Sequence, residues 1–150
     1  MALYITQADL EGFIGPTVVA AIFDDDNSGA VSQTALTEIL TLACFRVDAK
    51  IARVYSGPFP LTTVPQMVKH AALLFAKALS YERSTEYVRQ YGDAPMKAAK
   101  EFIEEVCEAR AYLTDNAGQP VPLNVGGIVT NSGPRVLVDS PDGTSNGGDF

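Results

Sequence analysis

The sequence is poor in residues that catalytic and metal-binding sites commonly use. Its 150 residues contain no tryptophan, one histidine and two cysteines. The histidine, His70, has no Cys or carboxylate at ligand spacing on the same helical turn, so neither a metal site nor a general base is indicated. The chain also lacks a nucleophile elbow, a phosphate-binding glycine loop and a zinc-type cysteine pair. We therefore expect no enzymatic activity and no cofactor.

Positive charge is scarce and scattered along the chain. Eleven Lys and Arg stand against 18 Asp and Glu, which gives a net charge of −7, and no basic run occurs. Because an acidic surface repels phosphate, we expect no specific binding of nucleic acid. No run approaches the roughly 18 apolar residues of a membrane span, and the first five residues lack the features of a signal peptide. We expect a soluble protein that is made in the cytoplasm and has no membrane partner.

The two cysteines, Cys44 and Cys107, are widely spaced, and both lie among apolar residues of predicted helices. They could form one disulfide bond. In such surroundings, however, cysteine usually behaves as a small hydrophobic residue, so we favour reduced, structural cysteines.

Apolar residues are abundant, at 47% of the chain, and they recur with the period of a helix. Thr6 with Asp9 three residues later is typical of a helix start, and Gly and Pro mark the breaks between segments. The segments predicted to be helical run from Thr6 to about Ile14, from Pro16, from Ser32 to about Tyr55, from Pro65, and from Ser84 or Thr85 with a break near Gly92 and Pro95. This pattern predicts an all-α fold, a small helical bundle over residues 1–113.

The long helix expected from Ser32 is apolar on two faces. One face has the spacing of a core stripe and contains Leu36, Leu40, Ala43, Val47, Ile51 and Val54. The opposite face contains Leu42, Phe45, Ala49 and Ala52. Since so small a chain has few elements to cover both faces, either this helix is central in the domain or Leu42 and Phe45 contact another subunit.

The acidic segment that begins at Asp24 partly resembles a calcium-binding loop. Asp24, Asp26 and Ser28 place oxygens at the first, third and fifth positions, and Gly29 follows at the sixth. Ala35 occupies the twelfth position, where a bidentate Glu would supply about two of the roughly six to eight ligand oxygens. We therefore favour an acidic turn whose carboxylates, with Ser32, cap the neighbouring helices.

From Thr114 onward the composition changes. Eleven of the last 37 residues are Gly or Pro, which is incompatible with a regular helix. Apolar residues nevertheless alternate with polar residues or prolines, as in an extended segment that pairs with another chain. We predict that residues 114–150 form a long extended docking tail, whose candidate subunit contacts are Val121, Leu123, Val125, Ile128, Val136 and Val138.

The order of several short segments is informative. These are the opening Tyr4-Ile5-Thr6-Gln7-Ala8-Asp9-Leu10, the acidic loop from Asp24 to Gly29 before a long helix, the turn from Phe59-Pro60-Leu61 to Val64-Pro65, the Ala-rich helix ending Tyr81-Glu82-Arg83, the helix from Tyr91 to Leu113, and Pro134-Arg135-Val136 in the tail. In this order they resemble the head–tail connector (adaptor) family of Mu-like and other long-tailed bacteriophages. The resemblance covers most of residues 3–113 and, loosely, the tail.

The resemblance implies a structural subunit of the virion. Such a subunit forms a ring, of twelve copies, between the portal protein and a stopper or tail-completion protein, at the head–tail interface. DNA passes through the ring without being specifically bound, and an acidic wall would let it slide. Glu104, Glu105 and Glu108 are the candidate channel-facing residues.

Two other functions are compatible with parts of the sequence. One is a small intracellular helical module that binds proteins and carries a degenerate calcium-type loop. The other is a helical regulator of transcription, which the acidic charge and the lack of a basic helix disfavour.

Overall fold

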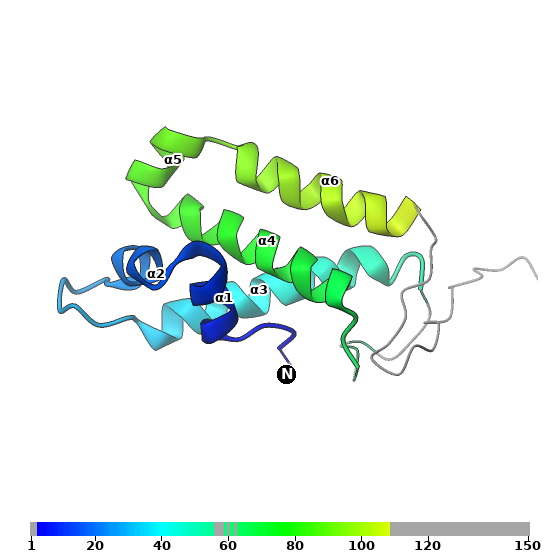
Figure 1. Ribbon diagram of the computed structural model, residues 1–150, viewed down its shortest axis with the longest axis horizontal. Coiled ribbons are helices and arrows are strands. Elements are labelled where there is room, and N and C mark those ends of the chain that lie inside the picture. The colour runs from blue at the N-terminus through cyan, green and yellow to red at the C-terminus, as the bar shows by residue number, and fades with distance from the viewer. Residues whose placement is uncertain (1–2, 56–58, 60, 62, 109–150) are drawn as a thin grey trace, which may run out of the picture.

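The computed structural model describes residues 3–55, 59, 61 and 63–108. Over these residues the chain forms six helices and no strand (Figure 1). The predicted all-α bundle is therefore confirmed, while the tail from Thr114 lies outside the described residues. None of the described helices is long and apolar enough to cross a membrane.

The first two helices, α1 (Gln7–Ile14) and α2 (Pro16–Phe23), begin where the sequence predicts, and α1 also ends there. The Asp9 amide donates to Thr6 Oγ1 at 3.2 Å, and the Thr6 amide donates to Asp9 Oδ2 at 2.8 Å, which completes a capping box. Gly15 separates the helices at φ 97°, a left-handed conformation that favours glycine. Pro16 then occupies the first position of α2, where its missing amide hydrogen costs nothing.

Helix α3 (Gln33–Ile51) carries the predicted core stripe. Leu36, Leu40, Ala43, Val47 and Ile51 are buried, and Val54 packs against the core just beyond the helix. The helix ends four residues before the expected Tyr55, since the chain tightens after Ile51 into a turn in which the Val54 amide donates to the Ile51 carbonyl at 3.0 Å. Ser32 occupies the N-cap position, but its side chain makes no capping hydrogen bond, so that part of the prediction was wrong.

Helix α4 (Gln66–Arg83) is the central helix of the bundle. It contacts every other helix and runs between α6 on one side and α1 with α3 on the other (Figure 1). The sequence predicts one broad apolar stripe on this helix, which consists of Met67, Val68, Ala71, Leu74, Phe75, Ala78 and Leu79. Val68, Ala71, Phe75 and Leu79 are buried as predicted, whereas Met67 is 45% exposed. The alternative that α3 is the central helix is therefore wrong.

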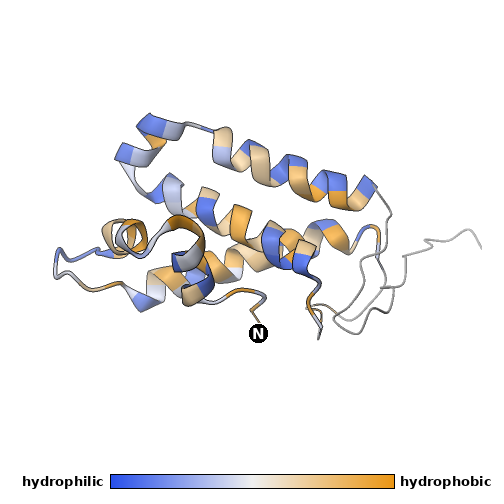
Figure 2. Ribbon diagram, in the orientation of Figure 1, coloured by the Kyte–Doolittle hydropathy of each residue, from blue (hydrophilic) through white to orange (hydrophobic). Residues whose placement is uncertain are grey.

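The last described helices, α5 (Thr85–Tyr91) and α6 (Ala94–Glu108), are separated by Gly92 as expected. α6 buries Ala99, Ile103 and Val106 along one stripe, and its other face is hydrophilic (Figure 2). Residues 109–113, where the sequence predicts that this helix continues, lie outside the described residues.

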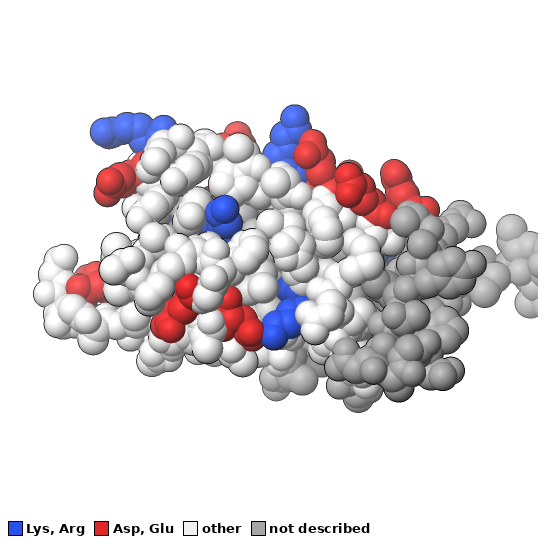
Figure 3. All heavy atoms as spheres, viewed as in Figure 1, with Lys and Arg blue, Asp and Glu red and all other residues white. Residues whose placement is uncertain are grey.

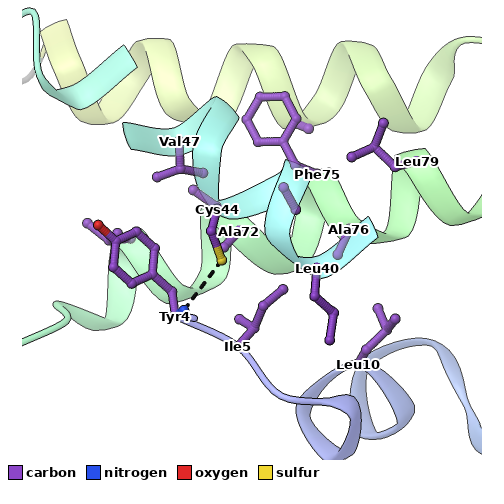
Figure 4. Close-up of a cluster of buried hydrophobic side chains, with 14 of the residues drawn as sticks. Tyr4, Ile5, Leu10, Leu40, Cys44, Val47, Ala72, Phe75, Ala76 and Leu79 are labelled. Carbon is purple, nitrogen blue, oxygen red and sulfur yellow. Dashed lines mark hydrogen bonds between the residues drawn. The ribbon is translucent and has the colours of Figure 1, made fainter. Parts of the chain in front are cut away.

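The core includes the segment that precedes α1. Tyr4 and Ile5 are buried against α3 and α4, together with Leu10, Leu40, Cys44, Phe75 and Leu79 (Figure 4). The Tyr4 amide donates to Cys44 Sγ at 3.4 Å, the Tyr4 hydroxyl donates to the carboxylate of Asp48, and the Leu61 amide donates to that hydroxyl at 2.9 Å. Tyr4 thus joins three separate parts of the chain by polar contacts inside the core.

Both cysteines are free, as the sequence predicts. Cys44 is buried, and Cys107 is partly buried with its Sγ 3.9 Å from the Lys50 carbonyl oxygen. Burial raises the pKa of both thiols. Both thiols are therefore protonated and poorly nucleophilic at neutral pH, as befits packing residues.

Candidate assembly surface

The second apolar face of α3 is exposed in the described structure. Phe45 is 57% exposed and Leu42 is 40% exposed, whereas the core stripe of the same helix is almost inaccessible. One turn of helix separates these two side chains, so they lie on the same face. The sequence predicted this pair as a subunit contact, and the structure places both side chains at the surface, where another subunit could reach them.

The two side chains line a shallow hollow of about 370 Å³ together with Thr37, Glu38 and Thr41. The Thr41 hydroxyl donates to the Thr37 carbonyl at 2.7 Å, and the Thr37 hydroxyl donates to the Gln33 carbonyl at the same distance. Because both hydroxyl hydrogens are used within the helix, the hollow is mainly apolar. We call it the α3 groove.

The candidate channel-facing residues lie on α6. Figure 3 shows acidic side chains along the outer edge of this helix, toward its C-terminal end. Glu104, Glu105 and Glu108 are all exposed. Glu104 Oε1 lies 3.5 Å from Lys50 Nζ on α3, so its charge is partly compensated, whereas no ion pair of Glu105 or Glu108 is present within the described part of the chain.

The acidic loop between α2 and α3 is organised around Asp24. Its Oδ1 accepts the Ser28 amide at 2.8 Å and its Oδ2 accepts the Gly29 amide at 2.9 Å. Asp25 pairs with Arg83 at the end of α4, at 2.6 Å. The turn interpretation was thus right about an acidic turn, but Asp24 holds the loop's own amides and not those of a helix start. Among the described residues, no three His, Cys, Asp or Glu side chains form a group that could hold a metal ion.

Three stacked tyrosines of α4 and α5, which we call the tyrosine surface, were not anticipated from the sequence. Tyr81, Tyr87 and Tyr91 stack with ring centroids 4.9 to 6.2 Å apart, and Lys77 Nζ lies 5.6 Å from the Tyr81 centroid. α5 has no buried residue, and the stack packs its Tyr87 and Tyr91 against Tyr81 of α4. The i,i+4 spacing of Tyr87 and Tyr91 was the available signal.

His70 also has an aromatic setting. Its ring makes edge contacts with Phe13 at 5.7 Å and with Phe102 at 5.0 Å, so it links α1, α4 and α6. His70 itself is exposed, so these ring contacts lie at the surface of the bundle.

The predicted tail contacts Val121, Leu123, Val125, Ile128, Val136 and Val138 lie outside the described residues. The structure therefore brings together only the α3 pair, Leu42 and Phe45, from the predicted interface set, and it places the acidic α6 set on a separate helix.

Comparison with known proteins gives one family. The family described as Bacteriophage Mu, Gp36 matches residues 4–129, which includes all six helices and the first part of the tail sequence. No curated protein matches the chain significantly. Since the match spans most of the 150 residues, the chain belongs to the bacteriophage Mu Gp36 family.

Proposed function

We propose that this phage protein is a non-enzymatic head–tail connector (adaptor) subunit that assembles into a ring around the DNA channel. The observation that carries the proposal is the exposed apolar face of α3, with Phe45 and Leu42 beside the α3 groove. An exposed apolar patch that contains an aromatic side chain is typical of a protein-binding site. Because the chain belongs to a phage family, we expect the partner that binds this face to be another subunit of the virion.

A ring would cover the exposed apolar face of α3, because each copy would pack against the next. In a closed ring each copy uses two different surfaces, one to receive a neighbour and one to reach the next neighbour. The α3 groove serves as the receiving surface, and the apolar part of the tail serves as the reaching element. In this proposal twelve copies form the ring, with the portal protein on one side and a stopper or tail-completion protein on the other.

The charge of the molecule agrees with a passage for DNA. With a net charge of −7 and exposed Glu105 and Glu108 on α6, the C-terminal part of this helix presents mainly negative charge, which repels phosphate. A wall of this kind lets DNA slide through without binding to it. We propose that these residues, with Glu104, face the channel and that the protein works at the head–tail interface of the virion without a cofactor.

The test is Phe45→Glu, with Met67→Glu as the matched control. Both residues are exposed and apolar, but Phe45 lies on α3 and Met67 at the start of α4. Because Phe45 is more than half exposed, the glutamate should leave the helical circular dichroism and the free energy of unfolding within about 0.5 kcal/mol of wild type.

The functional assay is complementation of a phage that lacks this protein. We expect Phe45→Glu to give filled heads without tails and Met67→Glu to give complete particles, as counted by negative-stain electron microscopy. Normal tail attachment by a folded Phe45→Glu protein would contradict the proposal. So would equal loss of tails with both variants, since the defect would then not be specific to the α3 face.

A further inference from the structure

We propose that the α3 groove of each copy binds the proline-containing tail segment Gln119–Val125 of a neighbouring copy. This inference rests on the proposed ring and names the partner of its receiving surface. The segment reads Gln-Pro-Val-Pro-Leu-Asn-Val. In this pairing it lies in the groove as a polyproline-type strand, with its apolar side chains against Leu42 and Phe45.

The chemistry of the groove selects this type of ligand. A helix surface has no free backbone donors or acceptors, because its amides and carbonyls bond within the helix. The hydroxyl hydrogens of Thr37 and Thr41 are also used within α3. The groove therefore offers apolar contact and cannot satisfy the main chain of a β-strand, so docking by strand addition is excluded at this site.

The segment matches these requirements. Pro120 and Pro122 have no amide hydrogen, and they favour the polyproline II conformation, whose backbone needs no partner other than water. Such segments are recognised by grooves that contain an aromatic side chain, which Phe45 supplies here. Val121 and Leu123 supply the apolar side chains.

Charge is compatible with the same pairing. Among the described residues, Glu38 is the only charged one that lines the groove. Residues 116–138 contain no acidic residue and one basic residue, Arg135. This part of the tail therefore brings no negative charge near Glu38.

The length of the chain permits contact between copies. The contact of Cys107 Sγ with the Lys50 carbonyl places the end of α6 beside the end of α3. Residues 109–119 then supply eleven residues, which reach roughly 35 Å when extended. In a ring, every copy contributes one segment and one groove, so an individually weak contact is reinforced by tethering at an effective concentration of about 1 mM.

Disulfide trapping tests the pairing in the full-length chain. Thr41→Cys places a thiol in the groove, and Asn124→Cys places one beside Leu123 without removing an apolar side chain. Equal amounts of the two single variants are mixed, so a bond between positions 41 and 124 can form only between copies. Two control mixtures keep one partner each: Glu86→Cys on α5 with Asn124→Cys, and Thr41→Cys with Asn146→Cys near the end of the tail.

We expect the 41–124 cross-link to form at least about tenfold faster than either control, because docking concentrates the two thiols. Equal rates in all mixtures would overturn the inference, and faster trapping at position 86 would assign the segment to the tyrosine surface instead. A chain that carries both Thr41→Cys and Asn124→Cys provides a further check. If it forms only intrachain bonds while the mixture of single variants gives no cross-linked product, the inference is overturned. If trapping fails while Phe45→Glu still blocks tail attachment, the pairing is wrong and the proposed function stands.

Discussion

Replacing Tyr4 by phenylalanine removes one oxygen atom from the centre of the polar contacts in the core. The Tyr4 hydroxyl donates to the carboxylate of Asp48 and accepts from the Leu61 amide. Tyr4 is 5% exposed and Asp48 is 9% exposed, so water cannot readily replace the missing oxygen. The Tyr4→Phe variant would therefore have a buried carboxylate without this donor and a main-chain amide without its acceptor.

The cost follows from those two groups. Loss of a buried hydrogen bond to a charged group costs about 1.5–3 kcal/mol, and an unsatisfied buried amide adds about 1–3 kcal/mol. Because the two terms share one oxygen and some relaxation is expected, we predict that Tyr4→Phe lowers the free energy of unfolding by about 2–4 kcal/mol at pH 7. Urea unfolding followed by helical circular dichroism measures this difference. A loss below about 0.5 kcal/mol would refute the assigned role of the hydroxyl.

Asp48→Asn provides the companion measurement. Burial raises the pKa of Asp48 above its ordinary 3.8, and the Tyr4 hydrogen bond offsets only part of that rise. The folded state therefore binds this proton more tightly than the unfolded state, so the contribution of Asp48 is fully present below pH 3.8 and is lost as pH rises through the folded pKa. The asparagine side chain keeps an acceptor for the Tyr4 hydroxyl and carries no charge. We expect the variant to gain stability relative to wild type as pH rises from about 3.5 to 7, and a constant difference over this range would contradict the reasoning.

Two further predictions concern the stability of the bundle. Ile103→Ala should lower the free energy of unfolding by about 2–5 kcal/mol, because Ile103 is fully buried where α6 packs on the core. The exposed Val88→Ala is the control and should change it by less than about 0.5 kcal/mol in the same urea experiment. Asp9→Asn should cost about 0.5–1 kcal/mol at pH 7, because Asp9 accepts from Thr6 and lies 2.7 Å from Lys69 Nζ. The contact with Lys69 and, second, the hydrogen bond from the Thr6 amide lower the pKa of Asp9 below 3.8. The stability lost in Asp9→Asn should therefore be full above pH 3.8 and disappear as pH falls through the folded pKa. A loss that persists at about pH 2 would contradict this prediction.

The helices were predictable because their signals are local. The capping pair Thr6 and Asp9, the proline at the start of α2 and the break at Gly92 each act within a few residues. Helical periodicity also separated the two faces of α3 correctly, because side-chain direction follows from position along a regular helix.

What the sequence could not supply was the arrangement in space. Periodicity gave α3 and α4 similar apolar stripes, so it could not decide which helix is central, and it placed the exposed Met67 with the buried residues of α4. The contacts of Tyr4 with Asp48 and Leu61 join residues 44 and 57 positions apart. A lone acidic residue on a helix gives no sign that it will be buried, because its burial depends on that distant partner.

The placement of Asp48 and Phe45 on one helix separates stability from assembly. Asp48 faces inward and anchors the N-terminal segment through Tyr4, whereas Phe45 faces outward and contributes nothing to the buried core. A rigid helix held from its inner face presents its outer face in a fixed geometry, which reduces the cost of ordering that surface when a partner binds. Tyr4→Phe should therefore lower the free energy of unfolding while the remaining folded protein still assembles. Phe45→Glu should leave the free energy of unfolding nearly unchanged and prevent assembly. A Tyr4→Phe protein that is folded but fails to attach tails would show that the N-terminal segment itself belongs to the interface.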